Sequence, residues 1–446
     1  MPEIRPFRAL RYDPEVVGDV ARVVAPPYDV IAPAQRVVLQ ARSPRNVVRI
    51  DLPVTEPMDA DPDDRYRRAA RLFASWRSDG TLRKDPRPSV YVYEQTYTVP
   101  GSAVMRVQRG FFGRLRLEPF GPDGGVFPHE RTLAGPKEDR YRLMRATGAN
   151  LSPIVTLYAD GSGKAARLLA QVAAGPAALD IVDDDGVRQR LWAVAADGSA
   201  AGPADELCAL AGAAPVTIAD GHHRYETALR YRDERRRGSA SESDPAYDYV
   251  LTLFYDTAEE LTVLATHRIV RGLGDPAAAE LLVSCGRYFD VERVGDADAL
   301  AASFAPASVG AGGVGRLGLW TRAGGAILRV RREAVAPILP AGGDALHRLD
   351  VTVLQAALES LAGIDAAAIA LGERVAYTKS AVEAVRDVQA VSAGAGADGA
   401  DAAFLLEPTP VSEISAVAAA GDVMPQKSTY FYPKAVTGLV INPFEW

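Results

Sequence analysis

The sequence predicts an α+β protein in which helices and mainly antiparallel strands are mixed along the chain. Segments 89–99 and 104–118 alternate apolar and polar residues on either side of Pro100-Gly101, which is typical of an antiparallel hairpin. Segment 63–78 carries apolar residues at helical spacing. Strand-like and helical segments do not alternate regularly, so the pattern does not favour a repeated βαβ architecture.

The main domain is expected to comprise residues 1–272. APPYDVI, residues 25–31, is expected to be a rigid extended turn, because its prolines restrict the backbone. The expected helices of this domain are 32–41, 63–78 and 163–174. Its expected strands are 46–53, 89–99, 104–118, 152–160, 179–182, 190–195, 216–219, 247–256 and 261–270.

Two further parts are expected to follow. Residues 273–345 are rich in alanine and glycine and are expected to form a smaller α/β segment with a hairpin at 315–332. Residues 346–446 are expected to form a C-terminal helical and strand part that completes the functional site. The expected elements of this last part are a helix from residue 346, a small-residue turn or surface loop at 390–403, and a helix at 411–420 that ends at Gly421.

Length, charge and cysteine content exclude several classes of protein. A chain of 446 residues is too long for one ordinary core, so more than one domain is expected. The net charge of −7 argues against a nucleic-acid partner or an anionic membrane surface. Cys208 and Cys285 form no CxxC pair, which argues against a disulfide framework or a structural zinc site. No apolar run approaches the ~20 residues of a membrane helix, and we expect a cytoplasmic protein.

The stretch PVTIADGHHRYETALRYRDERR, residues 215–236, holds two of the five histidines of the chain. We expect a short strand, a turn and then a helix. His222, His223 and Arg224 would lie on the first helical turn, where unpaired N–H groups and the helix dipole favour an anion. The guanidinium of Arg224 suits a phosphate group.

Asp220 is expected to end that strand and to form the turn with Gly221. Its carboxylate is well placed to hold a magnesium ion or to take a proton from a hydroxyl group. The alternative is that Asp220 only caps the helix and that Arg224 is a solvated surface residue. A zinc site is not favoured, because adjacent helical residues point about 100° apart and no third cysteine or histidine is near in sequence.

Segment 127–154, FPHERTLAGPKEDRYRLMRATGANLSPI, is dense in charged residues for a loop that leads into a helix. We expect Lys137 and Arg140 to contact phosphate oxygens. Glu130 is expected to bind a metal ion or to act as a base. The alternative is a solvated helix with ion pairs at i,i+3 and i,i+4 spacing.

The remaining histidines each lie within two residues of an arginine, in FPHERT, ATHRIV and ALHRLD. We expect His129, Arg131, His267 and Arg268 to contribute to one anion-binding pocket. His347 precedes an apolar helix and is expected to shape the start of that helix. Chance pairing in an arginine-rich chain is the alternative.

MPQKSTYFYPK, residues 424–434, places a lysine beside two hydroxyl groups and aromatic rings. The segment is not a Walker A motif, because Gln426 replaces the second glycine and Pro425 removes an N–H group. Alternatively, it is a buried C-terminal strand whose tyrosines pack on one face. The residues expected to bind a nucleotide or substrate are Lys427, Ser428, Thr429 and Lys434.

The chain resembles the uncharacterised bacterial and archaeal family known as domain of unknown function 1015. The resemblance rests on APPYDVI and on the motifs in segments 127–154, 215–236 and 424–434. DGHHRY is also similar to the helix-start signature of the ParB/sulfiredoxin superfamily, which implies a ParB/sulfiredoxin-like nucleotide-binding core elaborated with antiparallel strands. Free serine kinases of that superfamily carry an Asp-Gly-His-x-Arg box. Asp220, Gly221, His222 and Arg224 match this box.

The leading functional hypothesis is a magnesium-dependent phosphotransferase acting between ATP or ADP and a small hydroxylated metabolite, with serine or phosphoserine favoured. The expected catalytic residues are Asp220, Glu130, His222 and His223, and the expected magnesium ligands are Asp220 and Glu130. A phosphatase could use the same residues with water as the acceptor. A ParB-like nucleotide-binding regulatory protein without turnover is the alternative from another class, although no helix-turn-helix is visible in the sequence.

Overall fold

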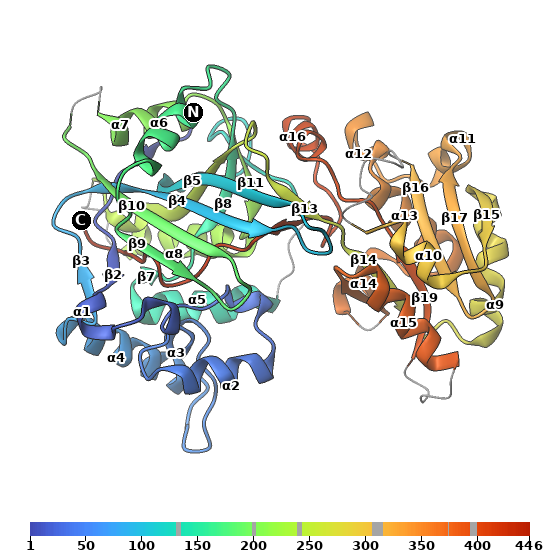
Figure 1. Cartoon of the computed structure of the whole chain (residues 1–446), viewed down its shortest axis with the longest axis horizontal. Helices are drawn as coiled ribbons and strands as arrows, with labels where there is room; N and C mark the ends of the chain where they lie inside the picture. The colour runs from blue at the N-terminus through green and yellow to red at the C-terminus, as the bar shows by residue number, and fades with distance from the viewer. Residues whose placement is uncertain (131–134, 199–201, 239–242, 306–314, 373, 393–398) are drawn as a thin grey trace.

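The computed structural model of the chain describes residues 1–446 except for 131–134, 199–201, 239–242, 306–314, 373 and 393–398. Helices and strands are mixed, and they form two bodies that lie side by side (Figure 1). A large mixed sheet organises the first body and a smaller antiparallel sheet organises the second. The mixed α/β class predicted from the sequence is confirmed.

The large sheet has nine strands, in the order β6-β11-β8-β12-β5-β4-β10-β9, with β1 paired to β5. The predicted hairpin is confirmed, since β4 and β5 pair antiparallel. Two pairs, β11 with β6 and β12 with β8, are parallel. The strands are β1 (Ile4–Arg5), β4 (Ser89–Thr98), β5 (Met105–Arg116), β6 (Val126–Pro128), β8 (Ile154–Tyr158), β9 (Leu179–Val182), β10 (Arg188–Ala195), β11 (Val216–Asp220) and β12 (Tyr249–Asp256).

Both faces of this sheet are covered, which explains why its central strands are buried along nearly their whole length. On β4, Tyr91 and Tyr93 pack into the core that includes the N-terminal helices, whereas Val90 and Val92 pack into a second core with the later helices. This division follows the alternation of side chains along a strand. The N-terminal helices are α2 (Pro33–Arg42), α3 (Val48–Asp51) and α4 (Asp64–Ser78), and the later ones are α6 (Lys164–Ala173), α7 (Pro203–Ala211) and α8 (His222–Gly238). Between α4 and α8 packs α5 (Gly135–Thr147).

The second body contains a six-stranded antiparallel sheet in the order β15-β17-β16-β19-β14-β18. The predicted hairpin at 315–332 is confirmed as β16 and β17. The strands are β14 (His267–Arg271), β15 (Phe289–Val294), β16 (Arg316–Thr321), β17 (Gly324–Val330), β18 (Val375–Thr378) and β19 (Ala400–Leu405). Its longer helices are α9 (Asp275–Ser284), α13 (Asp350–Ala362) and α15 (Ala381–Ser392). Because this sheet joins strands from residues 267–405, strand pairing links segments on both sides of residues 272 and 345; the three-part division itself stays a prediction.

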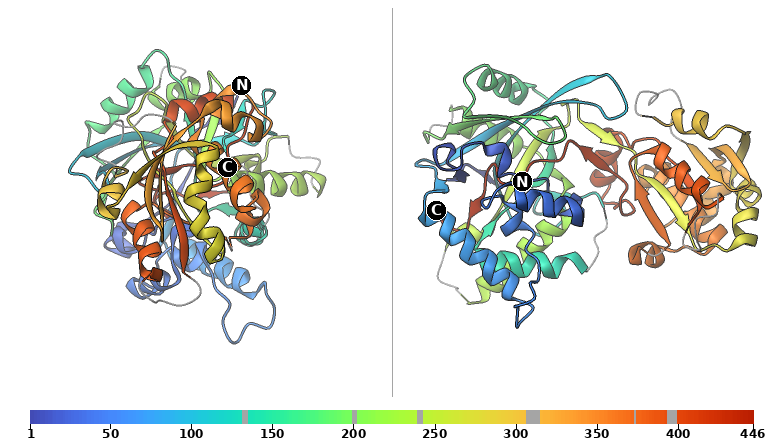
Figure 2. Two further views of the ribbon diagram at one scale, coloured as in Figure 1. Left: turned by 90° about the vertical axis from the view of Figure 1, so that its right-hand side faces the viewer. Right: turned by 60° about the horizontal axis from the view of Figure 1, so that its bottom comes forward.

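The C-terminal segment returns from the second body to the first. After α16 (Val411–Ala419), the chain forms β20 (Tyr430–Tyr432), which pairs with β13 (Thr262–Leu264). It then forms β21 (Asn442–Pro443), which pairs with β7 (Ala149–Asn150). The dark red end of the chain can be followed along this path in Figures 1 and 2.

One predicted element was wrong, and two were wrong in part. The expected strand at 46–53 contains α3 instead, and the Asn46 side chain forms the turn by accepting from the N–H of Val48 and donating to the carbonyl of Val24. The expected strand at 261–270 is split into β13 and β14, which belong to different sheets. The expected loop at 390–403 overlaps the buried strand β19, and residues 393–398 lie outside the described residues. Among the helices that the structure describes, none is long and apolar enough to cross a membrane.

Arg114 on β5 anchors the returning C-terminal segment, and its side chain is buried. Its guanidinium donates to Asn442 Oδ1 at 2.5 Å and to the carbonyl oxygens of Pro443 and Glu445 at 3.0 and 3.1 Å. Arg114→Ala is expected to lower the free energy of unfolding by about 2–4 kcal/mol, since it leaves buried acceptors unpaired and creates a cavity. Urea unfolding of this variant, with the exposed Arg87→Ala as control, measures the effect. Equal stability of the two variants would contradict this anchoring role.

Candidate functional site

A cavity of about 210 Å³ lies where the two bodies meet, and segments far apart in the sequence line it. The first body contributes strand ends and the APPYDVI turn, the second contributes the end of β18, and the C-terminal segment closes the cavity. We call this space the lysine cavity, after its three lysines. Its lining residues are Asp29, Val30, His129, Glu130, Ala219, Asp220, His222, Thr266, Tyr377, Thr378, Lys379, Lys427, Thr429, Tyr430 and Lys434.

Two of the sequence motifs meet because β6 and β11 are parallel neighbours. Pro128 lies opposite Ile218 in the register, so the residues that follow each strand emerge at the same edge of the sheet. His129 and Glu130 therefore come beside the Asp220 end of β11. The predicted strand, turn and helix order of the DGHHRY motif is confirmed.

Gly221 is required at the turn between β11 and α8. Its φ of +89° is one that residues with a side chain rarely adopt. A Cβ atom at this position would also lie 2.9 Å from Cγ2 of Ile154 and 3.1 Å from the Nε of Arg224. The glycine thus allows Asp220 to end the strand while His222 begins the helix directly afterwards.

Asp220 lies between two cations. Lys434 Nζ donates to one carboxylate oxygen at 2.9 Å, and the guanidinium of Arg224 lies 3.4 Å from the other. Burial opposes ionisation of Asp220, but Lys434 and Arg224 outweigh it and hold the pKa of that carboxyl well below its ordinary value. Asp220 is therefore an ionised group that fixes the position of Lys434.

The two histidines of the cavity contact each other, with ring centroids 4.7 Å apart. The backbone N–H of His129 donates to Nε2 of His222 at 3.2 Å. Burial, reinforced by the neighbouring His129, lowers the pKa of His222 to about 3. His222 is consequently neutral near pH 7 and acts as a hydrogen-bond acceptor.

His129 joins the sheet to the C-terminal segment through both ring nitrogens. Nδ1 lies 2.5 Å from the carbonyl oxygen of Ile218, and Nε2 lies 2.8 Å from the hydroxyl of Thr429. The contact with a carbonyl, which only accepts, requires a proton on Nδ1. His129 is buried, and its role in this geometry is to hold Thr429 against the end of β11.

Glu130 holds the MPQKSTYFYPK segment through three consecutive backbone groups. Its carboxylate accepts from the N–H groups of Lys427, Ser428 and Thr429 at 3.2, 3.0 and 2.9 Å, and from the Thr429 hydroxyl at 2.9 Å. Burial opposes ionisation, but hydrogen bonds from His129 and Thr429 and the charges of the histidines lower the pKa of Glu130 to about 2. The left-handed conformation of Lys427, with φ of 54°, lets the three N–H groups converge.

The three lysines reach the cavity from separate positions. Lys434 Nζ and Lys379 Nζ lie 4.4 and 4.1 Å from the ring centroid of Tyr430, within the range of a cation–π interaction. Burial and the nearby Lys434 lower the pKa of Lys379. Within the described residues, neither Lys379 nor Lys427 forms an ion pair with a carboxylate. The cavity therefore has positive charge that no described side chain neutralises directly.

Thr266 supplies a further sign of a ligand site. It lines the cavity, is 8% exposed, and its hydroxyl has no hydrogen-bond partner among the described residues. A buried polar group without a partner costs about 1–3 kcal/mol. A ligand with acceptor oxygens in the cavity would satisfy this hydroxyl.

Several residues predicted for the site lie near the cavity without lining it. Arg224 donates to the carbonyl of Pro153, which does not line the cavity. Arg268 donates to the Lys427 carbonyl at 3.1 Å, so it holds the backbone of that segment. Ser428 is buried, and its hydroxyl donates to Pro425 at 2.5 Å. These three residues position the site rather than face the cavity.

The other predicted site residues lie elsewhere or cannot be placed. Lys137 of α5 pairs with Glu226 of α8 at 2.7 Å, a contact between two helices rather than one at i,i+3 or i,i+4 spacing. Arg140 donates to the Asp51 carbonyl at 2.6 Å, and His267 accepts from the N–H of Leu406 at 3.2 Å, where burial lowers its pKa to about 4. His223 is outside the cavity lining, and Arg131 lies outside the described residues.

Sequence reasoning missed Asp29, Thr266, Tyr377, Thr378 and Lys379 as lining residues. The sequence does carry a signal for Asp29, because Asp29 lies in APPYDVI, one of the four motifs on which the family resemblance rests. The other four lie at the ends of ordinary strands, and their sequence pattern carries no comparable signal. The pairing of β14 with β18 places Tyr377 opposite Arg268. This pairing brings the end of β18, with Tyr377 and Thr378, to the cavity.

The expected magnesium ligands, Asp220 and Glu130, do not form a protein metal site together. Glu130 has its carboxylate occupied by the turn at 427–429, and Asp220 is paired with two cations. Among the described residues there is no group of three or more His, Cys, Asp or Glu side chains that could hold a metal ion. Asp29 is exposed and forms no hydrogen bond or ion pair with another described residue, so it is the more accessible carboxylate.

The chain belongs to the DUF1015 family of proteins of unknown function, whose family model matches residues 4–352. The resemblance inferred from the four motifs is thus confirmed. No curated protein matches the chain.

Several solved structures are distantly similar to the chain. A conserved hypothetical protein from Pyrococcus furiosus is 13% identical, with 69% of this chain and 87% of that chain covered and a TM-score of 0.33. A free serine kinase in complex with AMP is 12% identical, with 69% and 83% covered and a TM-score of 0.34. SbnI with a C-terminal truncation, from Staphylococcus aureus, is 11% identical, with 74% and 86% covered and a TM-score of 0.36. At these TM-scores the ParB/sulfiredoxin-like core stays a prediction.

Glu130→Gln tests the electrostatic role of the carboxylate. Because the folded-state pKa is lowered from 4.5 to about 2, ionised Glu130 stabilises the fold fully above pH 4.5, and this stabilisation declines as the pH falls toward 2. The difference in unfolding free energy between wild type and variant is expected to be largest at pH 7 and to shrink between pH 4.5 and pH 3. Denaturant unfolding at several pH values measures it. A difference that does not change with pH would contradict the assignment.

Proposed function

We propose that this protein binds the phosphate groups of a nucleotide in the lysine cavity and transfers a phosphoryl group to the hydroxyl of a small metabolite. The observation that carries the proposal is the convergence of Lys379, Lys427 and Lys434 on one cavity. Two of these lysines have no ion-pair partner among the described residues, and a buried hydroxyl in the same wall has no hydrogen-bond partner. A polyanion with many acceptor oxygens would satisfy all of these groups.

The chemistry of phosphoryl transfer suits such a cavity. The transition state spreads negative charge over the oxygens of the transferred group, so catalysis depends mainly on positioning and on fixed positive charge. Lys434 is held by Asp220 and by the face of Tyr430, and Lys379 lies over the same ring. These contacts place the cations before the ligand arrives, which avoids reorganisation during the reaction.

In the proposed step, the metabolite hydroxyl oxygen attacks the terminal phosphorus of ATP or ADP. The bond between that phosphorus and the bridging oxygen breaks, and the bridging oxygen leaves with the shortened nucleotide. The hydroxyl proton passes to a carboxylate. Asp29 suits this role better than Glu130, because Glu130 is bound by three N–H groups whereas Asp29 is exposed at the cavity.

The remaining predicted catalytic residues take supporting roles in this proposal. Asp220 holds Lys434, and neutral His222 accepts from the backbone of His129. A magnesium ion carried by the nucleotide phosphates would find Asp29 as its accessible protein carboxylate, since Mg²⁺ commonly uses one or two carboxylates together with phosphate and water. When bound, it would neutralise further phosphate charge. Serine remains the favoured acceptor, on the resemblance of the DGHHR box to that of free serine kinases.

Lys427→Met tests the phosphate role, because the Lys427 side chain is exposed and its loss removes no described ion pair. A charged hydrogen bond contributes about 1.5–3 kcal/mol, so the affinity for pyrophosphate is expected to fall about 10- to 100-fold. Isothermal titration calorimetry measures it. The matched control is Lys164→Met, which removes an exposed lysine of α6 away from the cavity. Equal pyrophosphate affinity in both variants would refute phosphate binding at this cavity.

Asp29→Asn tests transfer separately from binding. In the absence of magnesium, the variant is expected to bind ATP and ADP within about threefold of wild type, because Asp29 is exposed and a carboxylate makes no favourable contact of its own with phosphate oxygens. Transfer of phosphate from ³²P-labelled ATP or ADP to serine should fall at least 100-fold, in the range that general-base catalysis contributes. Nucleotide binding without any transfer by the wild-type protein would favour a regulatory protein over an enzyme.

A further inference from the structure

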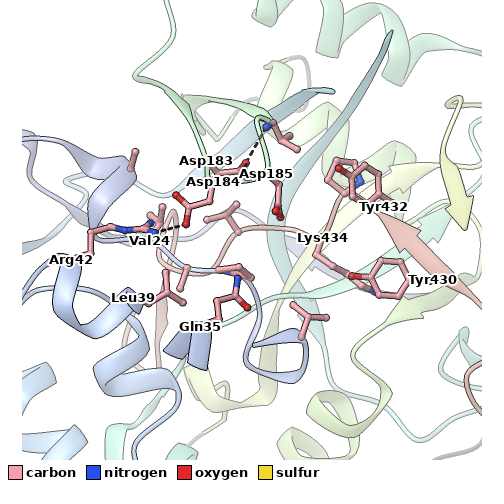
Figure 3. Close-up of a pocket in the computed structure, with 17 residues that line it drawn as sticks. Val24, Gln35, Leu39, Arg42, Asp183, Asp184, Asp185, Tyr430, Tyr432 and Lys434 are labelled. Atoms are coloured by element: carbon pink, nitrogen blue, oxygen red, sulfur yellow. Dashed lines mark hydrogen bonds and ion pairs between the residues drawn. The ribbon is translucent and has the colours of Figure 1, made fainter. Parts of the chain in front are cut away.

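A second cavity, of about 70 Å³, adjoins the lysine cavity and shares Val30, Tyr430 and Lys434 with it. It lies between α2, the segment before the APPYDVI turn, the turn at 183–187 and the C-terminal segment (Figure 3). We call it the side slot. Since the two spaces share a wall that includes Lys434, a ligand with phosphates beside that lysine can extend from one cavity into the other.

The walls of the side slot are mainly apolar. Val24, Leu39 and Val436 are buried and belong to one hydrophobic core. The slot holds on the order of five water molecules, since one water needs about 10–15 Å³ of such volume. This space is comparable to a planar ring system and is too small for a whole nucleotide.

Two polar side chains in the slot have no hydrogen-bond partner among the described residues: the amide of Gln35 and the carboxylate of Asp185. The two aspartates that precede Asp185 both have partners. Asp183 accepts from the Gln189 amide at 2.7 Å and from the N–H of Val187 at 3.0 Å, and Asp184 pairs with Arg42. Figure 3 shows Gln35 and Asp185 on opposite sides of the slot, with Tyr430 and Lys434 at one end.

We propose that the side slot binds the base of the nucleotide whose phosphates occupy the lysine cavity, with the ribose between the two spaces. Apolar walls suit the two faces of a base, and the Gln35 amide offers a donor and an acceptor to its edge. The Asp185 carboxylate accepts from ribose hydroxyls, and Lys434 lies where the sugar joins the phosphates. The inference rests on the proposed phosphate role of the lysine cavity and adds where the base and the ribose of that nucleotide bind.

Calorimetric titration with pyrophosphate and with ADP separates the two proposals. Wild-type protein is expected to bind ADP at least tenfold more tightly than pyrophosphate, because only ADP reaches the side slot. Gln35→Ala and Asp185→Asn should each weaken ADP about 3- to 10-fold, the range for one hydrogen bond, and leave pyrophosphate affinity unchanged. Gln40→Ala, on the same helix and outside the slot lining, is the matched control and should change neither affinity.

Each outcome decides one proposal. Equal affinity for ADP and pyrophosphate, or ADP affinity unaffected in both slot variants, overturns the nucleoside assignment and leaves the phosphate role intact. Absence of binding by both ligands overturns the phosphate role and the nucleoside assignment with it. A loss of ADP affinity in Gln40→Ala equal to that in Gln35→Ala also overturns the assignment, because the effect would then come from α2 as a whole.

Discussion

The site depends on one interaction, the carboxylate of Glu130 with three consecutive N–H groups of residues 427–429. Turns that aim successive N–H groups at one point bind anions, and in this protein the anion is a side chain of the chain itself. Glu130 follows β6 in the large sheet, whereas the turn belongs to the C-terminal segment that returns from the second body. A local hydrogen-bond pattern thus joins parts of the chain nearly 300 residues apart.

The surrounding contacts reinforce this junction. His129 holds Thr429, and Arg268 holds the carbonyl of Lys427, so the turn is fixed from both bodies. Once the turn is fixed, β20 and Lys434 follow along the edge of β13 and reach Asp220. Of the two carboxylates predicted to be catalytic, Asp220 therefore holds Lys434, and Glu130 holds the turn that carries Lys427. Among the described residues, Lys379 and Lys427 have no ion-pair partner and the Thr266 hydroxyl has no hydrogen-bond partner, so a ligand can satisfy these groups.

Much of this arrangement was predictable, because it follows from local patterns. Alternation of apolar and polar residues predicts the β4–β5 hairpin, and turn residues followed by helix formers predict the strand, turn and helix at Asp220-Gly221. Glu130, Asp220 and Lys427, one from each motif, line one cavity. The failures are non-local. Arg140 and His267 have the same residue types as ligand-binding groups, but each is paired within the protein. Lys379 reaches the cavity only through strand pairing, and the alanines of β19 form a strand because burial between β14 and β16 outweighs their low strand propensity.

The most direct test of this account is a crystal structure of the protein soaked with pyrophosphate. The account predicts density for the anion between Lys379, Lys427 and Lys434, with an oxygen within hydrogen-bond distance of the Thr266 hydroxyl and the turn at 427–429 still bound to Glu130. Pyrophosphate bound at another surface, with this cavity holding only water at a saturating concentration, would contradict it.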